Sequence, residues 1–266
     1  MRTRIGGLAL KALVIGALAL GSAAALAEDE PIATDRPDFV ESSDVVGGGV
    51  VQLEGGFSLE RATQGGATSR VTSTPFLLRV GLDAHWEARL ETDGQIGARV
   101  EYQGVTASDH GFADISLGLK RNFRKAAGSR PGVAVLLHAD LSSGSREFRG
   151  EGVRPSLRAV AEWDLPGDTS LGVMPGVFFD RNANHHFVSG IFAVTYAKQW
   201  TERAHTFIEV AGQQFAPAED GGNIITYDAG WAYLLTRNGQ VDVAVSHGAN
   251  ANTPDWSYGA GLSWRF

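Results

Sequence analysis

The chain ends in the sequence Trp256-Ser257-Tyr258-Gly259-Ala260-Gly261-Leu262-Ser263-Trp264-Arg265-Phe266. Apolar residues occupy every second position, and the positions between them carry serine, glycine and arginine. A period of two places these two sets on opposite faces of one β-strand. An apolar face backed by small and charged residues is typical of a strand that meets lipid outside a barrel and water inside it. This stretch therefore predicts a membrane-spanning strand.

The same alternation recurs along the chain in segments of roughly ten residues. It predicts twelve strands, near residues 49–60, 73–82, 85–93, 111–123, 132–141, 154–164, 169–180, 186–198, 203–213, 222–236, 239–248 and 255–266. We therefore expect an all-β fold, a transmembrane antiparallel up-and-down β-barrel of about 12 strands formed by residues 49–266. The segments around 171–180 and 187–197 are apolar on both faces, so their register stays open.

The connectors between these strands alternate in length. Those after even-numbered strands are mostly short, such as Asp83-Ala84 and Asn238, with an exception at 125–130. Those after odd-numbered strands include longer ones, expected as loops at 61–72, 92–110, 142–154 and 216–221. Outer-membrane barrels have short periplasmic turns and longer extracellular loops. The even strand count then places both ends of the barrel on the periplasmic side.

The first residues have the pattern of an export signal. Arg2, Arg4 and Lys11 precede an uncharged apolar run that ends in Ala25-Leu26-Ala27. This pattern predicts a secretory signal peptide over residues 1–27, cleaved after Ala27. Its removal takes away three positive charges, so the net charge of −7 becomes −10. Such an acidic chain argues against nucleic acid as a partner, and we expect the bacterial outer membrane as the location.

Tryptophan positions fit the expected topology. Trp86 begins an upward strand, and Trp163, Trp200 and Trp264 lie at the ends of downward strands. These four are expected at the periplasmic interface, and Trp256 at the opposite rim. Outer-membrane barrels carry aromatic girdles at both interfaces. The sequence therefore predicts a membrane-interface girdle, and a bilayer as partner.

Several motifs make the chain similar to a known family. They are TDRPDF at 34–39, LRVGL at 78–82, GFADISLGLK at 111–120, AEWDLPGD at 161–168 and the terminal run from 253 to 266. Together they resemble the outer-membrane transporter family labelled "MetA-pathway of phenol degradation". Ala113 departs from the glycine that the family often has there. The resemblance covers essentially the whole mature chain and implies a pore or transporter for small solutes, among them aromatic or hydrophobic compounds.

The inward face of the predicted strands carries charge. The candidates for lining the lumen and setting its selectivity are Glu54, Arg79, Glu87, Arg89, Glu91, Asp114, Lys120, Arg158, Glu162, Glu209, Asp228, Asp242 and Arg265. Charges in a barrel wall require water or an opposite charge. They either line a water-filled pathway or pair across a filled interior, and we favour a narrow pathway. Because acidic groups are in excess, an open pathway would prefer cations or neutral solutes.

The polar segment 28–48 precedes the first strand. It either threads into the lumen as a plug, with Asp35, Arg36 and Asp38 meeting lumen charges, or forms a disordered periplasmic tail. Phe266, at the end of the last strand, resembles the signal by which outer-membrane assembly machinery recognises barrels.

Two rival functions remain open beside the transporter. Some barrels are lipases with a serine and a histidine at the extracellular rim, and His185, His186 and Ser189 are the matching candidates here. No G-x-S-x-G motif and no metal-spaced His/Glu set accompanies them, so we expect no enzyme, no metal site and no cofactor. A non-conducting structural barrel is the other alternative. The sequence has no cysteine, which excludes disulfide and thiol chemistry.

Overall fold

The computed structural model describes residues 30–181 and 185–266, so the expected signal peptide lies outside the described residues. The described residues form one fifteen-stranded antiparallel sheet, which closes on itself where β15 pairs with β1. No helix of this part of the chain is long and apolar enough to cross a membrane.

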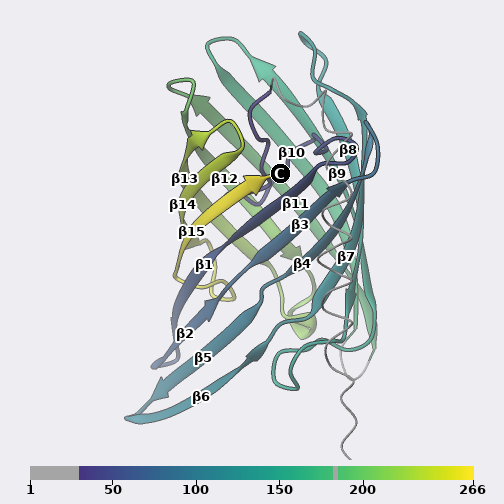
Figure 1. Ribbon diagram of the computed structural model, residues 1–266. Helices are drawn as coiled ribbons and strands as arrows, with labels where there is room; N and C mark the ends of the chain where they lie inside the picture. The colour runs from purple at the N-terminus through teal and green to yellow at the C-terminus, as the bar shows by residue number, and fades with distance from the viewer. Residues whose placement is uncertain (1–29, 182–184) are drawn as a thin grey trace, which may run out of the picture.

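The strands follow one another around the barrel (Figure 1). Their bounds are β1 (Val51–Gln64), β2 (Ala67–Ser73), β3 (Phe76–Gly81), β4 (Trp86–Thr92), β5 (Gln95–Tyr102), β6 (Val105–Phe112), β7 (Ile115–Arg124), β8 (Gly132–Leu141), β9 (Arg154–Leu165), β10 (Thr169–Arg181), β11 (His186–Gln199), β12 (Ala204–Phe215), β13 (Ile224–Thr236), β14 (Gly239–Gly248) and β15 (Trp256–Arg265).

Three of the barrel crossings are interrupted by two-residue breaks. The breaks lie at 74–75, 93–94 and 113–114, so the pairs β2/β3, β4/β5 and β6/β7 each form a single crossing. Pro75 lacks the N–H that a strand pairing needs. Gly94 has φ 66°, and a Cβ there would lie 2.2 Å from the Thr74 carbonyl oxygen, so only glycine fits. Fifteen strands minus three gives twelve crossings, which confirms the predicted twelve-stranded barrel.

The two rims differ as the connector lengths predict. Both ends of the barrel meet at one rim, where the Phe266 N–H donates to the Val51 carbonyl oxygen at 2.8 Å. This rim also carries the short turns, such as 166–168 and 237–238. We call it the periplasmic rim, and the opposite one the extracellular rim.

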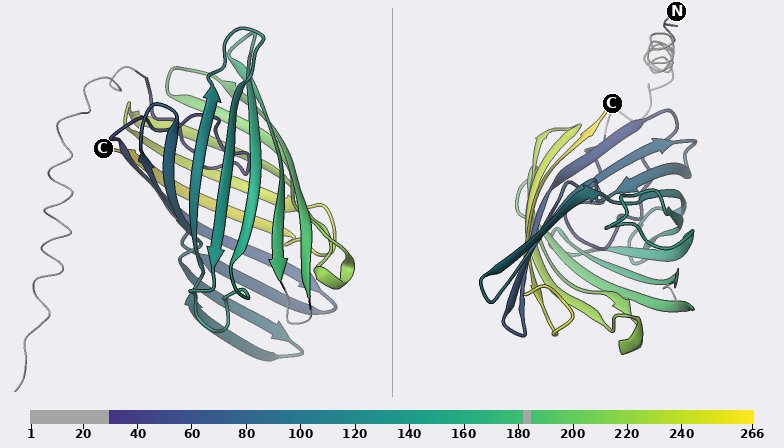
Figure 2. Two further views of the ribbon diagram at one scale, coloured as in Figure 1. Left: turned by 90° about the vertical axis from the view of Figure 1, so that its right-hand side faces the viewer. Right: turned by 90° about the horizontal axis from the view of Figure 1, so that it is seen from below.

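Two of the expected loops are wrong. Residues 61–72 and 92–110 are mostly strand: β1 and β2 meet at Gly65-Gly66, and β5 and β6 form a hairpin around Gln103-Gly104. These strands project past the rest of the wall at the extracellular side (Figures 1 and 2). The sheet continues there into water, where neither face needs apolar residues, so the alternation that marks the membrane segments disappears. Residues 142–153 lie between strands as expected, and 216–223 include a short 3₁₀ helix, Ala218–Asp220.

The outer surface of the barrel is an apolar belt. Its exposed side chains include Phe57, Leu117, Leu119, Leu137, Leu157, Val188, Phe192, Ile208, Val210, Tyr227, Val243, Tyr258 and Leu262. In register, Trp264 pairs with Leu53 near the periplasmic rim, and Trp256 pairs with Arg61 near the extracellular one. Trp86, Trp163 and Trp200 lie at strand ends on the periplasmic rim. Exposed apolar area of this extent fits contact with lipid.

A small apolar core lies inside the barrel. Val40, from the segment before β1, packs with Leu136, Val160, Met174, Ala193 and Ala211 of strands β8 to β12, and Phe39 lies against them. This contact fixes the register of the two strands that are apolar on both faces. Met174 of β10 and Ala193 of β11 point inward, where they pack against the chain itself rather than against water.

Candidate functional site

Residues 30–50, which we call the N-terminal segment, enter the barrel at the periplasmic rim, turn inside it and return to β1. At entry, the Ile32 N–H donates to the Arg237 carbonyl oxygen at 2.8 Å. At exit, the Gly49 N–H donates to the Gly81 carbonyl oxygen at 2.9 Å. Between these points the segment lies within the ring of strands (Figure 2, right).

The segment meets a buried ion network on one side of the lumen. The Asp35 carboxylate lies 2.5 Å from Arg89 Nη1, 3.2 Å from Lys120 Nζ and 3.5 Å from Arg79 Nη1. The wall supplies further acids, because Glu87 pairs with Arg79 and with Arg89 at 2.9 Å. Glu54 pairs with Arg79 at 3.1 Å and accepts the main-chain N–H of Asp35 at 3.0 Å. Asp35 is thus the point where three wall cations converge.

The opposite wall holds the segment mainly by its main chain. The two Glu209 oxygens accept the N–H groups of Phe39 and Val40, each at 2.8 Å. On the side of the ion network, the Val46 N–H donates to Glu87 of β4 at 3.0 Å, and the Ser43 N–H donates to Glu162 of β9. Hydrogen bonds to ionised acceptors are stronger than neutral ones. Because the segment forms no strand, its main-chain N–H groups have no partners in a sheet. The wall carboxylates accept their hydrogen bonds instead.

Arg36 lies against two glycines of the wall, which leave space for its guanidinium. Its Nη2 pairs with the Asp242 Oδ1 of β14 at 3.0 Å. A Cβ at Gly56 would lie 2.8 Å from Arg36 Nη2, and one at Gly261 would lie 2.4 Å from Arg36 Nε. These two glycines are direct partners in the β1–β15 register. They leave the space that the guanidinium fills.

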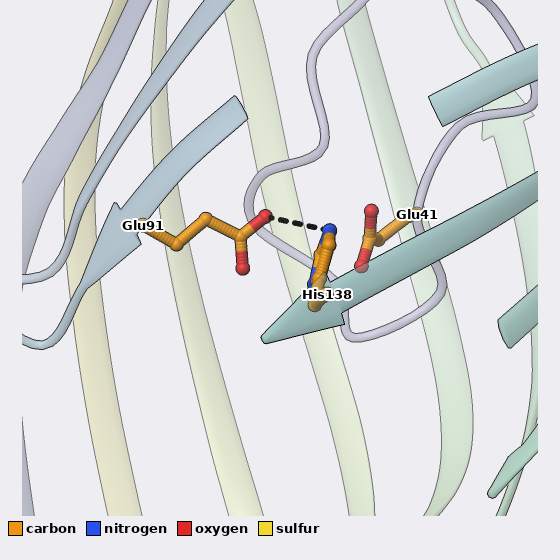
Figure 3. A group of neighbouring side chains, drawn as sticks. All are labelled: Glu41, Glu91 and His138. Carbon is orange, nitrogen blue, oxygen red and sulfur yellow. Dashed lines mark ion pairs between the residues drawn. The ribbon is translucent and has the colours of Figure 1, made fainter. Parts of the chain in front are cut away.

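Glu41, Glu91 and His138 come together from the segment, β4 and β8 (Figure 3). Their candidate ligand atoms all lie within 4.8 Å of one another, and His138 Nε2 is 3.6 Å from Glu91 Oε1. Arg89 Nη2 pairs with Glu41 at 3.0 Å and with Glu91 at 2.7 Å, and Arg158 pairs with Glu41 at 2.5 Å. Because the arginines already neutralise both carboxylates, we assign the cluster to holding the segment rather than to a metal ion.

The two aspartates of the segment sit in opposite electrostatic environments. Burial favours a higher pKa for Asp35, but the charges of Arg79, Lys120 and Arg89 hold that pKa well below its usual range. Burial and the nearby charge of Glu209 raise the pKa of Asp38 well above its usual range. Asp35 is therefore bound as a carboxylate, whereas the surroundings of Asp38 disfavour its ionised form.

Two cavities lie on either side of the segment. The extracellular one, about 390 Å³, includes Asp35, Arg36 and Glu41 in its lining. The periplasmic one, about 650 Å³, includes Arg36, Asp38, Val40 and Ser42. Segment residues thus form part of the boundary of both cavities.

The structure places most of the predicted lumen residues in the barrel interior. Glu54, Arg79, Glu87, Arg89, Lys120, Glu209, Asp228 and Asp242 are buried, and Glu91, Arg158 and Glu162 are half-buried beside the segment. Two lie elsewhere. Asp114 is at the extracellular rim, where it accepts the N–H groups of Gly144 and Gly150 and pairs with Arg154 at 2.9 Å. Arg265 is at the periplasmic rim, where it donates to Asn238 Oδ1 and the Glu30 carbonyl oxygen, each at 2.8 Å.

Sequence reasoning missed several residues that hold the segment. Glu41 belongs to a stretch without period, so nothing marked it beyond its charge. Gln52 and Asn122 are uncharged wall residues whose side-chain amides donate to the carbonyl oxygens of Ala33 and Ser43, each at 2.8 Å. Their inward position follows from the alternation, since Gln52 precedes Glu54 by two residues and Asn122 follows Lys120 by two.

The candidate serine–histidine pair is not assembled. Ser189 is buried on the inner face of β11. His186 lies three positions earlier in the same strand and therefore points to the outer face. His185 Nε2 lies 3.0 Å from Asp220 Oδ1. The geometry gives no support to a nucleophilic serine at this rim.

A closed barrel with an apolar exterior, charged interior and aromatic residues at both rims defines an integral outer-membrane β-barrel protein. The family model "Putative MetA-pathway of phenol degradation" matches residues 34–266. The chain belongs to this family, and the resemblance drawn from its motifs is confirmed. A comparison with curated protein sequences gives no match.

Solved structures share the fold at low sequence identity. The COG4313 outer membrane channel from Pseudomonas putida F1 is 12% identical with a TM-score of 0.60, and the match covers 86% of this chain and 99% of that one. The KdgM porin is 12% identical with a TM-score of 0.52, covering 81% and 99%. The β domain of the Bordetella autotransporter BrkA is 12% identical with a TM-score of 0.53, covering 81% and 98%.

Proposed function

We propose that this protein is an outer-membrane pore for small solutes and that its N-terminal segment is the plug of that pore. The observation that carries the proposal is the division of the lumen. Cavities open on both sides of the segment, and the segment is bound by ion pairs and main-chain hydrogen bonds rather than by a covalent link. Polar contacts of this kind can be exchanged for water when a segment moves.

The extracellular cavity suits a solute that is part apolar and part polar. Pro75, Phe76, Leu77, Ile96 and Phe148 line it together with charged groups. Its volume of about 390 Å³ falls in the range of small-molecule sites. An aromatic compound with a polar substituent would place its ring against the apolar side chains and its polar group among the charges. The family description, which refers to phenol degradation, supports this class of solute.

The charged lumen residues set the preference of the pathway once the segment moves. Glu54, Glu87, Glu209, Asp228 and Asp242 would face a water-filled channel together with Arg79, Arg89 and Lys120. The acidic excess favours cations and neutral solutes over anions. Charge reversal at Arg89 or Arg158 should increase the preference for cations in planar-bilayer recordings, and an unchanged reversal potential would argue against a selectivity role.

Single-channel conductance of the mature chain with and without residues 28–44 tests openness and plug together. We expect rare openings for the mature chain and a large, continuous conductance for the deletion variant. A deletion variant that folds, as judged by heat-modifiable migration in gels, yet conducts no more than the mature chain would overturn the plug. Conductance in neither variant would overturn the pore.

A disulfide offers the reverse test, since the native chain has no cysteine that could interfere. A Cβ at Gly132 of β8 would lie 3.4 Å from the Ser43 Cβ, close to the spacing of about 3.5–4.5 Å that a disulfide needs. In the double variant Ser43→Cys, Gly132→Cys, oxidation should hold the segment in place and abolish openings, and reduction should restore them. Openings that persist in the oxidised, cross-linked protein would exclude the segment as the gate.

Two further parts of the proposal concern activity and assembly. We propose no ester-hydrolase activity, in line with the separated Ser189 and His186, so purified protein should not release fatty acid from phospholipid micelles. We also propose that Phe266, exposed at the end of the chain, is recognised by the assembly machinery. Deletion of Phe266 should lower the amount of folded protein in the outer membrane, and a normal amount would remove that role.

A further inference from the structure

Three arginines form a row on the outward surface beyond the apolar belt. Arg61 of β1 lies directly opposite Arg70 of β2, and Arg70 lies directly opposite Arg99 of β5. Directly paired residues point to the same face of a sheet. Arg61 follows the outward residues Phe57 and Leu59 at a spacing of two, so the whole row points away from the lumen. All three side chains are exposed.

Such a row is unfavourable unless something neutralises it. Directly opposed side chains on neighbouring strands have Cβ atoms about 4.5–5.5 Å apart, and like charges in this position are destabilising. Among the described residues, no ion pair involves any of the three arginines. The acids closest in the register are Glu101, two positions beyond Arg99, and Asp255, whose Oδ2 accepts the Thr63 N–H at 2.8 Å. The three arginines outnumber these two acids and therefore form a strip of net positive charge.

The strip lies at the level where the belt ends. Arg61 pairs with Trp256 of β15, and Trp256 pairs with His247 of β14. Trp264 marks the other rim eight residues further along β15, or about 26 Å at roughly 3.3 Å per residue. The nine residues from Trp256 to Trp264 fall in the range of about 9–11 residues with which a tilted strand crosses the hydrocarbon core. The arginines consequently lie at the height of the lipid headgroups of the outer leaflet.

A hollow of about 670 Å³ connects the strip to the belt. It is lined by Leu59, Arg61, Thr63, Arg70, His247, Asp255, Trp256 and Tyr258. The Trp256 and Tyr258 rings stack with centroids 6.4 Å apart, and His247 packs edge-on against Trp256 at 4.6 Å. One end of the hollow is thus apolar and aromatic, and the other holds Arg61 and Arg70 beside one acid, Asp255.

We propose that this surface binds the phosphate groups of a phosphorylated lipid in the outer leaflet. Guanidinium groups match phosphate oxygens in a bidentate geometry, and neighbouring arginines can share one phosphate or hold two. Leu59 and Tyr258 contact the adjoining acyl chain. The row faces away from the lumen and borders the belt, so a solute passing through the pore does not meet it. A lipid headgroup meets both halves of the hollow at once.

Binding of lipopolysaccharide to the purified full chain in detergent tests the proposal, with its enzymatically dephosphorylated form and inorganic phosphate as comparisons. We expect binding of the phosphorylated lipid, at least tenfold weaker binding of the dephosphorylated lipid, and a tenfold or greater loss in the triple variant Arg61→Gln, Arg70→Gln, Arg99→Gln. The matched control is Arg121→Gln, because Arg121 lies over the ring of Trp86 at the periplasmic rim. This control should bind like the unchanged protein.

Three results would overturn the inference. They are equal affinity for the two lipid forms, full binding by the triple variant, and inorganic phosphate binding as tightly as the lipid, which would indicate a site for soluble anions. Heat-modifiable migration establishes that each variant is folded. Single-channel conductance of the triple variant should be unchanged, since the strip lies outside the lumen, so the outcome for the lipid site is independent of the proposed pore.

Discussion

The two walls of the lumen hold the same segment in different ways. The wall of β3, β4, β7 and β9 supplies Arg79, Arg89, Lys120 and Arg158, which bind carboxylates of the segment. The wall of β12 and β14 supplies Glu209 and Asp242, which bind main-chain N–H groups and Arg36. Asp35 and Glu41 of the segment are therefore bound by the cations of the first wall, whereas both walls bind main-chain N–H groups, since Glu87 and Glu162 of the first wall accept those of Val46 and Ser43.

This difference fixes how the segment lies in the barrel. Rotating the segment by half a turn would bring Asp35 and Glu41 against Glu209 and Asp242, and would leave the wall cations without their acids. Buried charges without partners are strongly unfavourable. The asymmetry therefore specifies one docked arrangement, and substitutions on the two sides should weaken docking by different amounts.

The largest effect is expected at the basic wall. Asp35→Asn keeps the shape of the side chain but removes the charge on which Arg79, Arg89 and Lys120 converge. Loss of one partner from a buried ion cluster costs about 3–5 kcal/mol. We expect the closed state to be lost in single-channel recordings, along with a lower unfolding temperature. Asp38→Asn, on the same segment but facing acids, is the matched control and should stay closed; opening by both variants alike would contradict the asymmetry.

A smaller effect is expected at the acidic wall. Glu209→Gln leaves one amide oxygen for two N–H donors, and hydrogen bonds to charged groups contribute about 1.5–3 kcal/mol each. The same change removes the repulsion between Glu209 and Asp38, which offsets part of the loss. We expect a net weakening of docking of about 1–2 kcal/mol, measured as a rise in open probability below that of Asp35→Asn. Glu219→Gln, in the extracellular connector, should leave open probability unchanged, and an effect of Glu209→Gln equal to that of Asp35→Asn would remove the ranking.

The alternation in the sequence was enough to predict the barrel, because lipid and water impose a period of two wherever a strand crosses the membrane. It failed above the membrane, where Arg61, Arg70 and Arg99 belong to strands rather than loops, since a sheet in water has no such requirement. It was also ambiguous at Met174 and Ala193, whose inward apolar side chains pack against Val40. A period cannot tell an inner face that meets water from one that meets a segment of the same chain.

The alternation also indicated which charged residues point inward, but not which of them pair. Glu54, Arg79 and Asp35 are far apart in sequence, and their contact depends on the barrel circumference and on the path of a segment with no period. Asp114 was expected in the lumen because it precedes the inward positions of β7 by two residues. It lies at the extracellular mouth, where it lines the cavity and accepts main-chain N–H groups of the loop 142–153.

The contact of Arg36 with the acidic wall can be weakened without changing any charge. In Gly261→Ala the new Cβ would lie 2.4 Å from Arg36 Nε, so the guanidinium must move away from Asp242. We expect docking to weaken by about 1 kcal/mol, the usual range for a partly exposed pair, and open probability to rise severalfold. Gly259→Ala is the matched control on the same strand, because its Cβ would meet nothing closer than the Phe57 carbonyl oxygen at 4.0 Å. Equal conductance in both variants would show that Arg36 does not contribute to closure.

The smallest expected effect is a pH dependence that distinguishes the two aspartates. Asp38 faces Glu209 and Glu162, and burial together with these charges raises its pKa. A group whose pKa is raised on docking binds its proton more tightly in the docked state, so docking strengthens as pH falls toward the ordinary aspartate pKa of about 4 and weakens as pH rises. Asp35 has a lowered pKa and acts oppositely: its contribution is present above about pH 4 and is lost as pH falls further.

Closure should therefore be strongest at mildly acidic pH. Open probability in the unchanged protein should fall between pH 8 and pH 5, and Asp38→Asn should flatten this slope while keeping the pore closed. Because Glu209 contributes to the raised pKa of Asp38, Glu209→Gln should reduce the slope as well, in addition to its effect on closure at any one pH. A slope that survives in Asp38→Asn would assign the pH dependence to another group. In that case the ion cluster around Asp35, and not the protonation of Asp38, would distinguish the two walls.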